Sequence, residues 1–185
     1  MGDHSWGLLF PLSPEKGEVM KEIHICSLKE YRWLLRSHHI PTNSSYALIS
    51  SSYPLELPEA DLISYSFECY DDIDFDCLGR CLSPEAARRF AKAIKSNPHI
   101  DSWYFVCDGG CRRSAAIACA ALRFWGYEEE EFKIWSNPRK EPNVWVFTLM
   151  SDALGLPIDD IDLDLRIHLN RSAIHSAFHH ASEMN

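Results

Sequence analysis

Hydrophobic and polar positions change their spacing repeatedly along this chain, and the changes predict strands and helices in alternation. Four stretches have the length and composition of strands: Glu22–Cys26, Tyr46–Ser50, Leu62–Cys69 and Trp103–Val106. The last of these is wholly apolar, which is typical of a central strand buried on both faces. We therefore expect an α/β fold with a mostly parallel central sheet of four or five strands, flanked by helices.

Helix signals occupy the segments around these strands. Ser27 and Glu30 have the spacing of a capping box, in which each side chain bonds a free amide at the start of a helix. Ser83 followed by Pro84 marks a second helix start, after which apolar residues recur at helical spacing. Further helices are predicted over Ala115–Trp125, Glu128–Trp135, Asn143–Leu154 and Ile167–His180.

The composition is that of one folded domain with short extensions. The chain has 185 residues, of which 46% are hydrophobic and 24% charged, enough for a single core. Residues 1–20, rich in glycine, proline and charge, are predicted to form an N-terminal leader, and residues 21–156 the α/β domain. Residues 157–185 are predicted to form an acidic linker and a C-terminal helix that packs on the domain or extends from it. The pattern does not indicate an oligomeric state.

The net charge excludes some classes of binding partner, and the cysteines indicate the cellular compartment. Asp and Glu outnumber Lys and Arg by 27 to 18, and the net charge of −9 gives no broad attraction for nucleic acid or an anionic membrane. No apolar run approaches the ~18 residues that span a bilayer, and no secretory signal precedes the seven cysteines. We expect a cytoplasmic protein with reduced cysteines, without nucleic-acid or membrane partners, whose anion-binding site is local.

Residues 103–114 have a pattern that is typical of an anion-binding loop with a reactive cysteine. A buried strand leads into a turn with Gly109 and Gly110 and then into a helix, so consecutive backbone amides can surround an anion at the positive end of that helix. Cys107, at the end of the strand, lies in that field, which favours the nucleophilic thiolate. Arg113 can hold two oxygens of a phosphoryl group, and Ser114 can donate a hydrogen bond to the sulfur.

The sequence Cys107-x-x-Gly110-x-x-Arg113-Ser114 resembles the signature loop of the cysteine-dependent protein tyrosine and dual-specificity phosphatases. The wider segment 67–155 looks like the compact, predicted tyrosine phosphatase branch of that family. The resemblance implies a phosphatase-like fold and a metal-independent phosphomonoesterase that forms a phosphocysteine intermediate at Cys107, without a cofactor. Its substrate would be a phosphorylated protein or a small phosphoester, and Cys107, Arg113 and Ser114 would be catalytic. The phosphate-binding residues would be Asp108, Gly109, Gly110, Cys111, Arg112 and Arg113.

Such an enzyme also needs an acid that protonates the leaving oxygen. By resemblance, this acid lies on a loop after a strand, some distance before Cys107. Four aspartates stand in that stretch: Asp71, Asp72, Asp74 and Asp76. Asp72 is our choice, because it follows directly on the predicted strand and because Asp72-Ile73 matches an Asp-Ile pair of the family. Asp76 is the second choice.

No metal site is predicted from the sequence. Asp72, Asp74 and Asp76 have the spacing that opens a calcium loop, but Cys77 stands where that loop needs glycine. His175 and His179 lie one helical turn apart but lack a third ligand.

Three alternatives stay open. A rhodanese-like sulfurtransferase loop has the form Cys-x-x-Gly-x-Arg, and Arg112 satisfies that spacing from Cys107. A non-catalytic phosphate-binding module, a pseudophosphatase, is suggested by two departures: Val106 stands where the family usually has histidine, and Asp108 puts a carboxylate next to the thiolate. The third is an ordinary strand-to-helix turn with a buried cysteine. The phosphatase is preferred because Ser114 falls one place late for a sulfurtransferase, and a plain turn gives no reason for two arginines.

Overall fold

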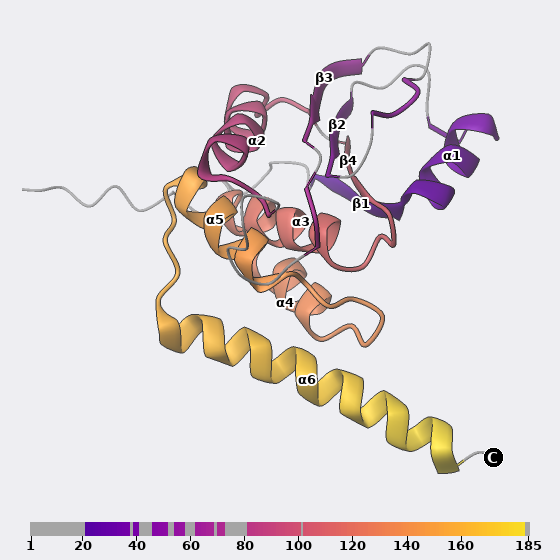
Figure 1. The fold of residues 1–185 in the computed structure, drawn as a ribbon, viewed down its shortest axis with the longest axis vertical. Coiled ribbons are helices and arrows are strands. Elements are labelled where there is room, and N and C mark those ends of the chain that lie inside the picture. The colour runs from indigo at the N-terminus through magenta and orange to yellow at the C-terminus, as the bar shows by residue number, and fades with distance from the viewer. Residues whose placement is uncertain are drawn as a thin grey trace, which may run out of the picture.

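The computed structural model describes residues 21–37, 39–40, 46–51, 54–57, 62–68, 70–72, 81–100 and 102–183. Within these ranges the chain forms a single small α/β domain, in which six helices flank one four-stranded, all-parallel sheet (Figure 1). The strands are β1 (Glu22–Ser27), β2 (Tyr46–Ser50), β3 (Leu62–Phe67) and β4 (Ser102–Cys107). Their order is β1-β4-β2-β3, which places β4 inside the sheet. The predicted α/β architecture is confirmed; the predicted leader, residues 1–20, lies outside the described residues.

The helices begin and end where local side-chain chemistry allows it. They are α1 (Leu28–Arg36), α2 (Pro84–Ser96), α3 (Arg113–Phe124), α4 (Glu128–Trp135), α5 (Val144–Leu154) and α6 (Asp160–Glu183). The capping box predicted for α1 is present, with Ser27 and Glu30 each bonding the other's backbone amide. Ser83 caps α2, and Asn143 caps α5 by accepting from the amide of Val146 at 2.9 Å.

The core has two parts because alternate side chains of β4 point to opposite faces of the sheet. All six residues of β4 are buried. Trp103 and Phe105 belong to the larger cluster, which α2, α3 and α5 cover. Tyr104 and Val106 belong to the smaller cluster, which α1 covers with Tyr31. Figure 1 shows α1 on the opposite side of the sheet from α2 and α5. Helix α3 is buried from residue 113 to residue 122, so the loop that leads into it has a rigid support.

Helix α6 begins earlier than the sequence predicts. The pattern placed its start at Ile167 and an acidic linker before it, but the helix starts at Asp160. Asp159 accepts a hydrogen bond from the amide of Asp162 at 2.8 Å, and carboxylates are favourable in the first turn of a helix. The acidic residues of the expected linker therefore form a helix start. Among the helices of the described part, none is long and apolar enough to cross a membrane.

Candidate active site

The loop between Cys107 and Arg113 joins the last residue of β4 to the first residue of α3. It lies at the carboxyl edge of the sheet, and β4 has β1 on one side and β2 on the other. This is the position predicted for it, and the edge where parallel α/β sheets bind their ligands. In the parallel pairing of β1 with β4, Ser27 stands opposite Cys107, so the start of α1 lies beside the loop.

Gly110 shapes the loop. Its φ of +66° is in the left-handed region, and a Cβ added there would lie 2.3 Å from the backbone nitrogen of Ser27. No other residue fits between the loop and β1 without moving backbone. The ammonium of Lys140 donates to the carbonyl oxygen of Gly110 at 2.5 Å and to that of Ile25 at 3.3 Å, which fastens the loop to β1 a second time.

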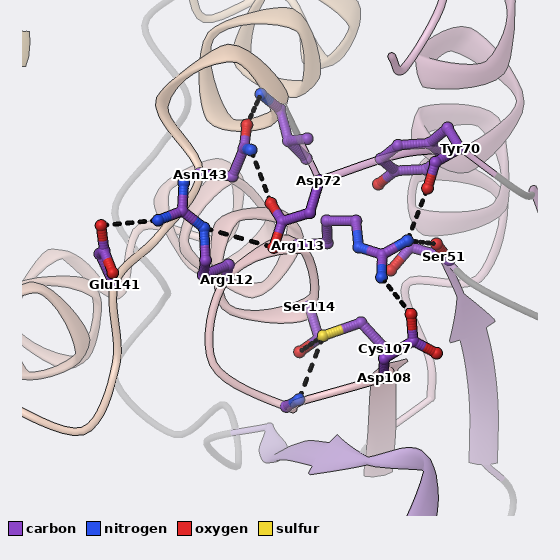
Figure 2. A network of polar contacts seen from close by, with 12 residues as sticks. Ser51, Tyr70, Asp72, Cys107, Asp108, Arg112, Arg113, Ser114, Glu141 and Asn143 are labelled. Carbon is purple, nitrogen blue, oxygen red and sulfur yellow. Dashed lines mark hydrogen bonds and ion pairs between the residues drawn. The ribbon is translucent and has the colours of Figure 1, made fainter. Parts of the chain in front are cut away.

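Cys107 is buried, with 2% of its surface exposed, and its sulfur has two polar neighbours. The amide of Gly110 donates to Sγ at 3.2 Å, and the hydroxyl of Ser114 lies 3.1 Å from it (Figure 2). Both groups can donate to a sulfur anion, so they stabilise either an attacking thiolate or a departing one.

Arg113 extends from the start of α3 into the same site and is held by backbone oxygens. Its Nη1 donates to the carbonyl oxygen of Ser51 at 2.8 Å and to that of Tyr70 at 2.6 Å. Its Nη2 forms an ion pair with Asp108 Oδ2 at 2.6 Å (Figure 2). Its Nε is buried and has no hydrogen-bond partner among the described residues. A buried donor without a partner is uncommon in native proteins and points to a missing acceptor.

The electrostatics of the site keep the arginine charged. Burial works against its charge, but the hydrogen bond to Asp108 and the charge of Cys107 hold the pKa of Arg113 above its ordinary value. The charge of Asp72 acts in the same direction. Burial, followed by the charges of Cys107 and Asp72, raises the pKa of the Cys111 thiol. Cys107, Asp72 and Arg113 therefore share one electrostatic environment.

Arg112 leaves the loop in a different direction from Arg113. Its Nε lies 3.3 Å from Asp72 Oδ2, and its Nη1 lies 2.6 Å from Glu141 Oε1. The amide of the Asn143 side chain donates to Asp72 Oδ1 at 2.8 Å. Arg112 and Asn143 thus tie the Asp72 carboxylate to the loop (Figure 2). The guanidinium of Arg112 is therefore bonded to two carboxylates.

The structure brings most of the predicted site residues together. Cys107, Asp108, Gly110, Arg113 and Ser114 contact one another within the loop and the first turn of α3. Asp72 is linked to them through Arg112. Asp71 is exposed, whereas Asp74, Asp76 and the Ile73 of the matched pair lie outside the described residues.

Several contacts of the site were not predicted from the sequence. The carbonyl oxygens of Ser51 and Tyr70 orient Arg113. Every residue has a backbone carbonyl, so the sequence does not indicate which ones accept these hydrogen bonds. Glu141 and Lys140 hold the loop from the segment before α5. Asn143 was predicted only as the start of a helix, which gives no indication of its contact with Asp72.

Comparisons with family models, with curated proteins and with solved structures find no match for this chain. Within the described ranges, His, Cys, Asp and Glu side chains form no group of three or more that could hold a metal ion. The functional conclusion therefore depends on the chemistry of the loop and its neighbours.

Proposed function

We propose that this protein is a metal-independent phosphomonoesterase in which Cys107 is the nucleophile and forms a phosphocysteine intermediate. The observation that carries the proposal is the buried Nε of Arg113, which has no hydrogen-bond partner among the described residues and belongs to the residue at the end of the Cys107 loop. A tetrahedral phosphoryl group bound over Cys107 would supply the acceptor. The contacts of Sγ with the Gly110 amide and the Ser114 hydroxyl support the role of a nucleophile and leaving group. The resemblance of the loop to the phosphatase signature agrees with this chemistry.

The reaction has two steps. Cys107 Sγ attacks phosphorus and forms an S–P bond, while the bond between phosphorus and the leaving oxygen breaks. Asp72 gives its proton to that oxygen, so the alcohol or phenol leaves neutral. Asp72 then takes a proton from water, whose oxygen attacks phosphorus. The S–P bond breaks, inorganic phosphate forms, and the hydroxyl of Ser114 donates to the returning thiolate.

Arg113 and the loop amides would hold the non-bridging oxygens during both steps. Nε is ready to donate, whereas Nη2 is bonded to Asp108. Binding of phosphate at both nitrogens requires Asp108 to turn away, and its side chain, 52% exposed, has solvent to turn into. The two backbone carbonyls on Nη1 keep the guanidinium in place meanwhile.

The contacts of the two arginines favour the phosphatase over a sulfurtransferase. Arg112, which has the sulfurtransferase spacing, faces Asp72 and Glu141. Arg113, which has the phosphatase spacing, lies beside Asp108 at the loop. One observation favours the non-catalytic alternative: the Asp108–Arg113 ion pair places a carboxylate of the chain itself where a phosphate oxygen would bind.

Turnover of para-nitrophenyl phosphate by the purified chain tests the proposal. We expect steady hydrolysis that EDTA leaves unchanged and that Cys107→Ser abolishes. Cys81→Ser, which removes a buried thiol outside the site, should retain the activity. Loss of activity in EDTA would contradict the cysteine mechanism. Phosphate binding without turnover would support the pseudophosphatase, and cyanide-dependent formation of thiocyanate from thiosulfate would support the sulfurtransferase.

A reducing compartment such as the cytoplasm fits this proposal. A cysteine nucleophile acts only as a free thiol or thiolate. No disulfide joins the five cysteines that the described ranges place. A phosphorylated protein or a small phosphoester is the proposed substrate.

A further inference from the structure

The outer face of α1 carries a cluster of cations around an exposed indole. Lys29, Arg32, Trp33 and Arg36 recur at the spacing that puts side chains on one face of a helix, and all four are exposed. We call these four residues the basic face of α1. Trp33 is 58% exposed, and its ring stacks on His39 with 4.9 Å between centroids. The three cations make no ion pair with another described residue.

The basic face borders the candidate active site. It lines a cavity of about 770 Å³, to which Leu28, Ser37 and Asp108 also contribute among the described residues. Asp108 is the residue after Cys107, so the cavity reaches the loop itself. The adjacency follows from the fold, because α1 begins at Ser27, which pairs with Cys107 across β1 and β4. Gly110 packs against the same Ser27, so the loop and the first turn of α1 cannot separate.

The basic face gathers three cations in a chain whose net charge is −9. An acidic ligand would therefore be attracted locally and not by the protein as a whole. Among the described residues, Glu30 lies on the same helix and Asp108 lines the same cavity, and both carboxylates are bonded elsewhere. The amide of Ser27 donates to Glu30 Oε2 at 2.6 Å, and Asp108 pairs with Arg113. The basic face therefore offers three cations and an aromatic surface to a ligand that carries both negative and apolar groups.

We propose that the basic face of α1 binds an acidic segment of a phosphoprotein substrate, next to the phosphorylated residue that enters the loop. This proposal rests on the proposed function, since it assigns a substrate to the same site. Lys29, Arg32 and Arg36 attract the carboxylates or further phosphates of the segment, and Trp33 packs against its apolar side chains. A phosphorylated protein with acidic flanking residues is thus favoured over an isolated small phosphoester.

Binding of a peptide probe to the full chain tests the surface separately from catalysis. The probe is a fluorescein-labelled peptide in which tyrosine is flanked by glutamates and leucines; the matched probe has glutamines instead of glutamates. We expect the acidic probe to bind more tightly than the neutral one, and added salt to weaken this preference. Arg32→Glu with Arg36→Glu should weaken binding of the acidic probe by roughly tenfold, because two attractions become repulsions. Lys92→Glu with Arg171→Glu makes the same charge change on α2 and α6 and should not weaken it.

A second measurement links the surface to hydrolysis. With phosphotyrosine in both peptides, the ratio of kcat/KM for the acidic peptide to that for the neutral peptide should fall roughly tenfold in the α1 variant. Arg32→Gln with Arg36→Gln, a milder change, should lower the ratio in the same direction, and thermal unfolding reports whether each variant folds. A ratio that the α1 variants leave unchanged would overturn the proposal while the proposed function stands.

The remaining outcomes separate the two proposals. If no phosphopeptide is hydrolysed but binding of the acidic probe depends on Arg32 and Arg36, the proposed function fails and the binding surface stands. If probe binding does not depend on these arginines, the surface proposal fails whatever the turnover. A fluorescein-labelled polyuridine strand that binds the basic face more tightly than the acidic peptide would also overturn it, because the occupant would then be RNA.

Discussion

At the scale of single residues, the adjacent Arg112 and Arg113 have different contacts. Arg112 is the N-cap of α3 and Arg113 is its first helical residue, and the two side chains extend in different directions (Figure 2). Arg113 is buried against the Ser51 and Tyr70 carbonyls beside Asp108, whereas Arg112 binds Asp72 and Glu141. In the proposed function, Arg113 binds the phosphoryl group and Arg112 positions Asp72, the acid.

Lysine substitutions separate these two roles. Arg113→Lys should lower kcat/KM for para-nitrophenyl phosphate about a hundredfold or more, because an ammonium cannot reproduce the planar donor geometry around Nε. Arg112→Lys should lower it only several-fold, because an ammonium can still pair with Asp72. Steady-state kinetics of both variants give the ranking. The reverse ranking would assign the anion to Arg112 and favour the sulfurtransferase spacing.

In the proposed function, the Asp108 carboxylate competes with phosphate for Arg113. Asp108→Asn removes this charge, so inorganic phosphate should inhibit more strongly, with an inhibition constant lower by a few-fold to about tenfold. Competitive inhibition kinetics measure the change. Asp152→Asn, which removes an exposed carboxylate on α5, should leave the inhibition constant unchanged. An inhibition constant that rises in Asp108→Asn would show that Asp108 supports anion binding instead.

At the scale of elements, the sequence predicts well what is local and poorly what depends on distant partners. The strands of the sheet and the caps of α1 and α2 follow from short patterns, and the structure has them. The predicted start of α6 was wrong: the acidic residues before Ile167 form the first turns of the helix. Arg166, at the end of these turns, forms a buried pair with Glu131 of α4, with Nε and Oε1 2.6 Å apart. Asn170 adds a hydrogen bond to the carbonyl oxygen of Trp135. No local pattern reports such pairs.

The capping box of α1 makes a prediction about stability and pH. Ser27→Ala should lower the free energy of unfolding by about 1 kcal/mol at neutral pH, since it leaves the amide of Glu30 unpaired. Hydrogen bonds from the Ser27 amide and then its side chain lower the pKa of Glu30. The contribution of the Glu30 carboxylate is therefore full above its unfolded pKa and is lost as pH falls through its lower folded pKa.

Urea unfolding at several pH values measures both effects. The stability difference between the wild type and Glu30→Gln should shrink as pH falls below about 4, the ordinary range of a glutamate. A difference that stays constant down to acid pH would contradict the role of the charged carboxylate.

The buried pair between α4 and α6 makes a second prediction at this scale. Glu131→Gln leaves the charge of Arg166 buried without a counter-charge, which should cost about 3–5 kcal/mol in the free energy of unfolding. Glu131→Gln combined with Arg166→Met should cost less than the sum of the single changes. Urea unfolding of the four chains gives the coupling, and hydrogen exchange shows whether α6 loosens first. Additive costs would contradict a direct pair.

At the scale of the whole molecule, the fold assembles the site from segments far apart in the sequence. The loop from Cys107 to Ser114 was predictable because its chemistry is local. The contacts around it were not, since Ser51 and Tyr70 lie 62 and 43 residues from Arg113. The same holds for the basic face of α1, which only the pairing of β1 with β4 brings beside the loop. Parallel strands place their carboxyl ends at one edge of the sheet. The fold therefore brings Asp72, Arg113 and the basic face of α1 close to the Cys107 loop.

Detection of the phosphocysteine tests the central claim most directly. The full chain is mixed with para-nitrophenyl phosphate, quenched rapidly, digested and examined by mass spectrometry. We predict a phosphoryl group on Cys107 that is absent from Cys107→Ser and accumulates in Asp72→Asn, because that variant lacks the base that activates water in the second step. Hydrolysis of the substrate without a phosphoryl group on Cys107, or with one on another residue, would contradict the mechanism.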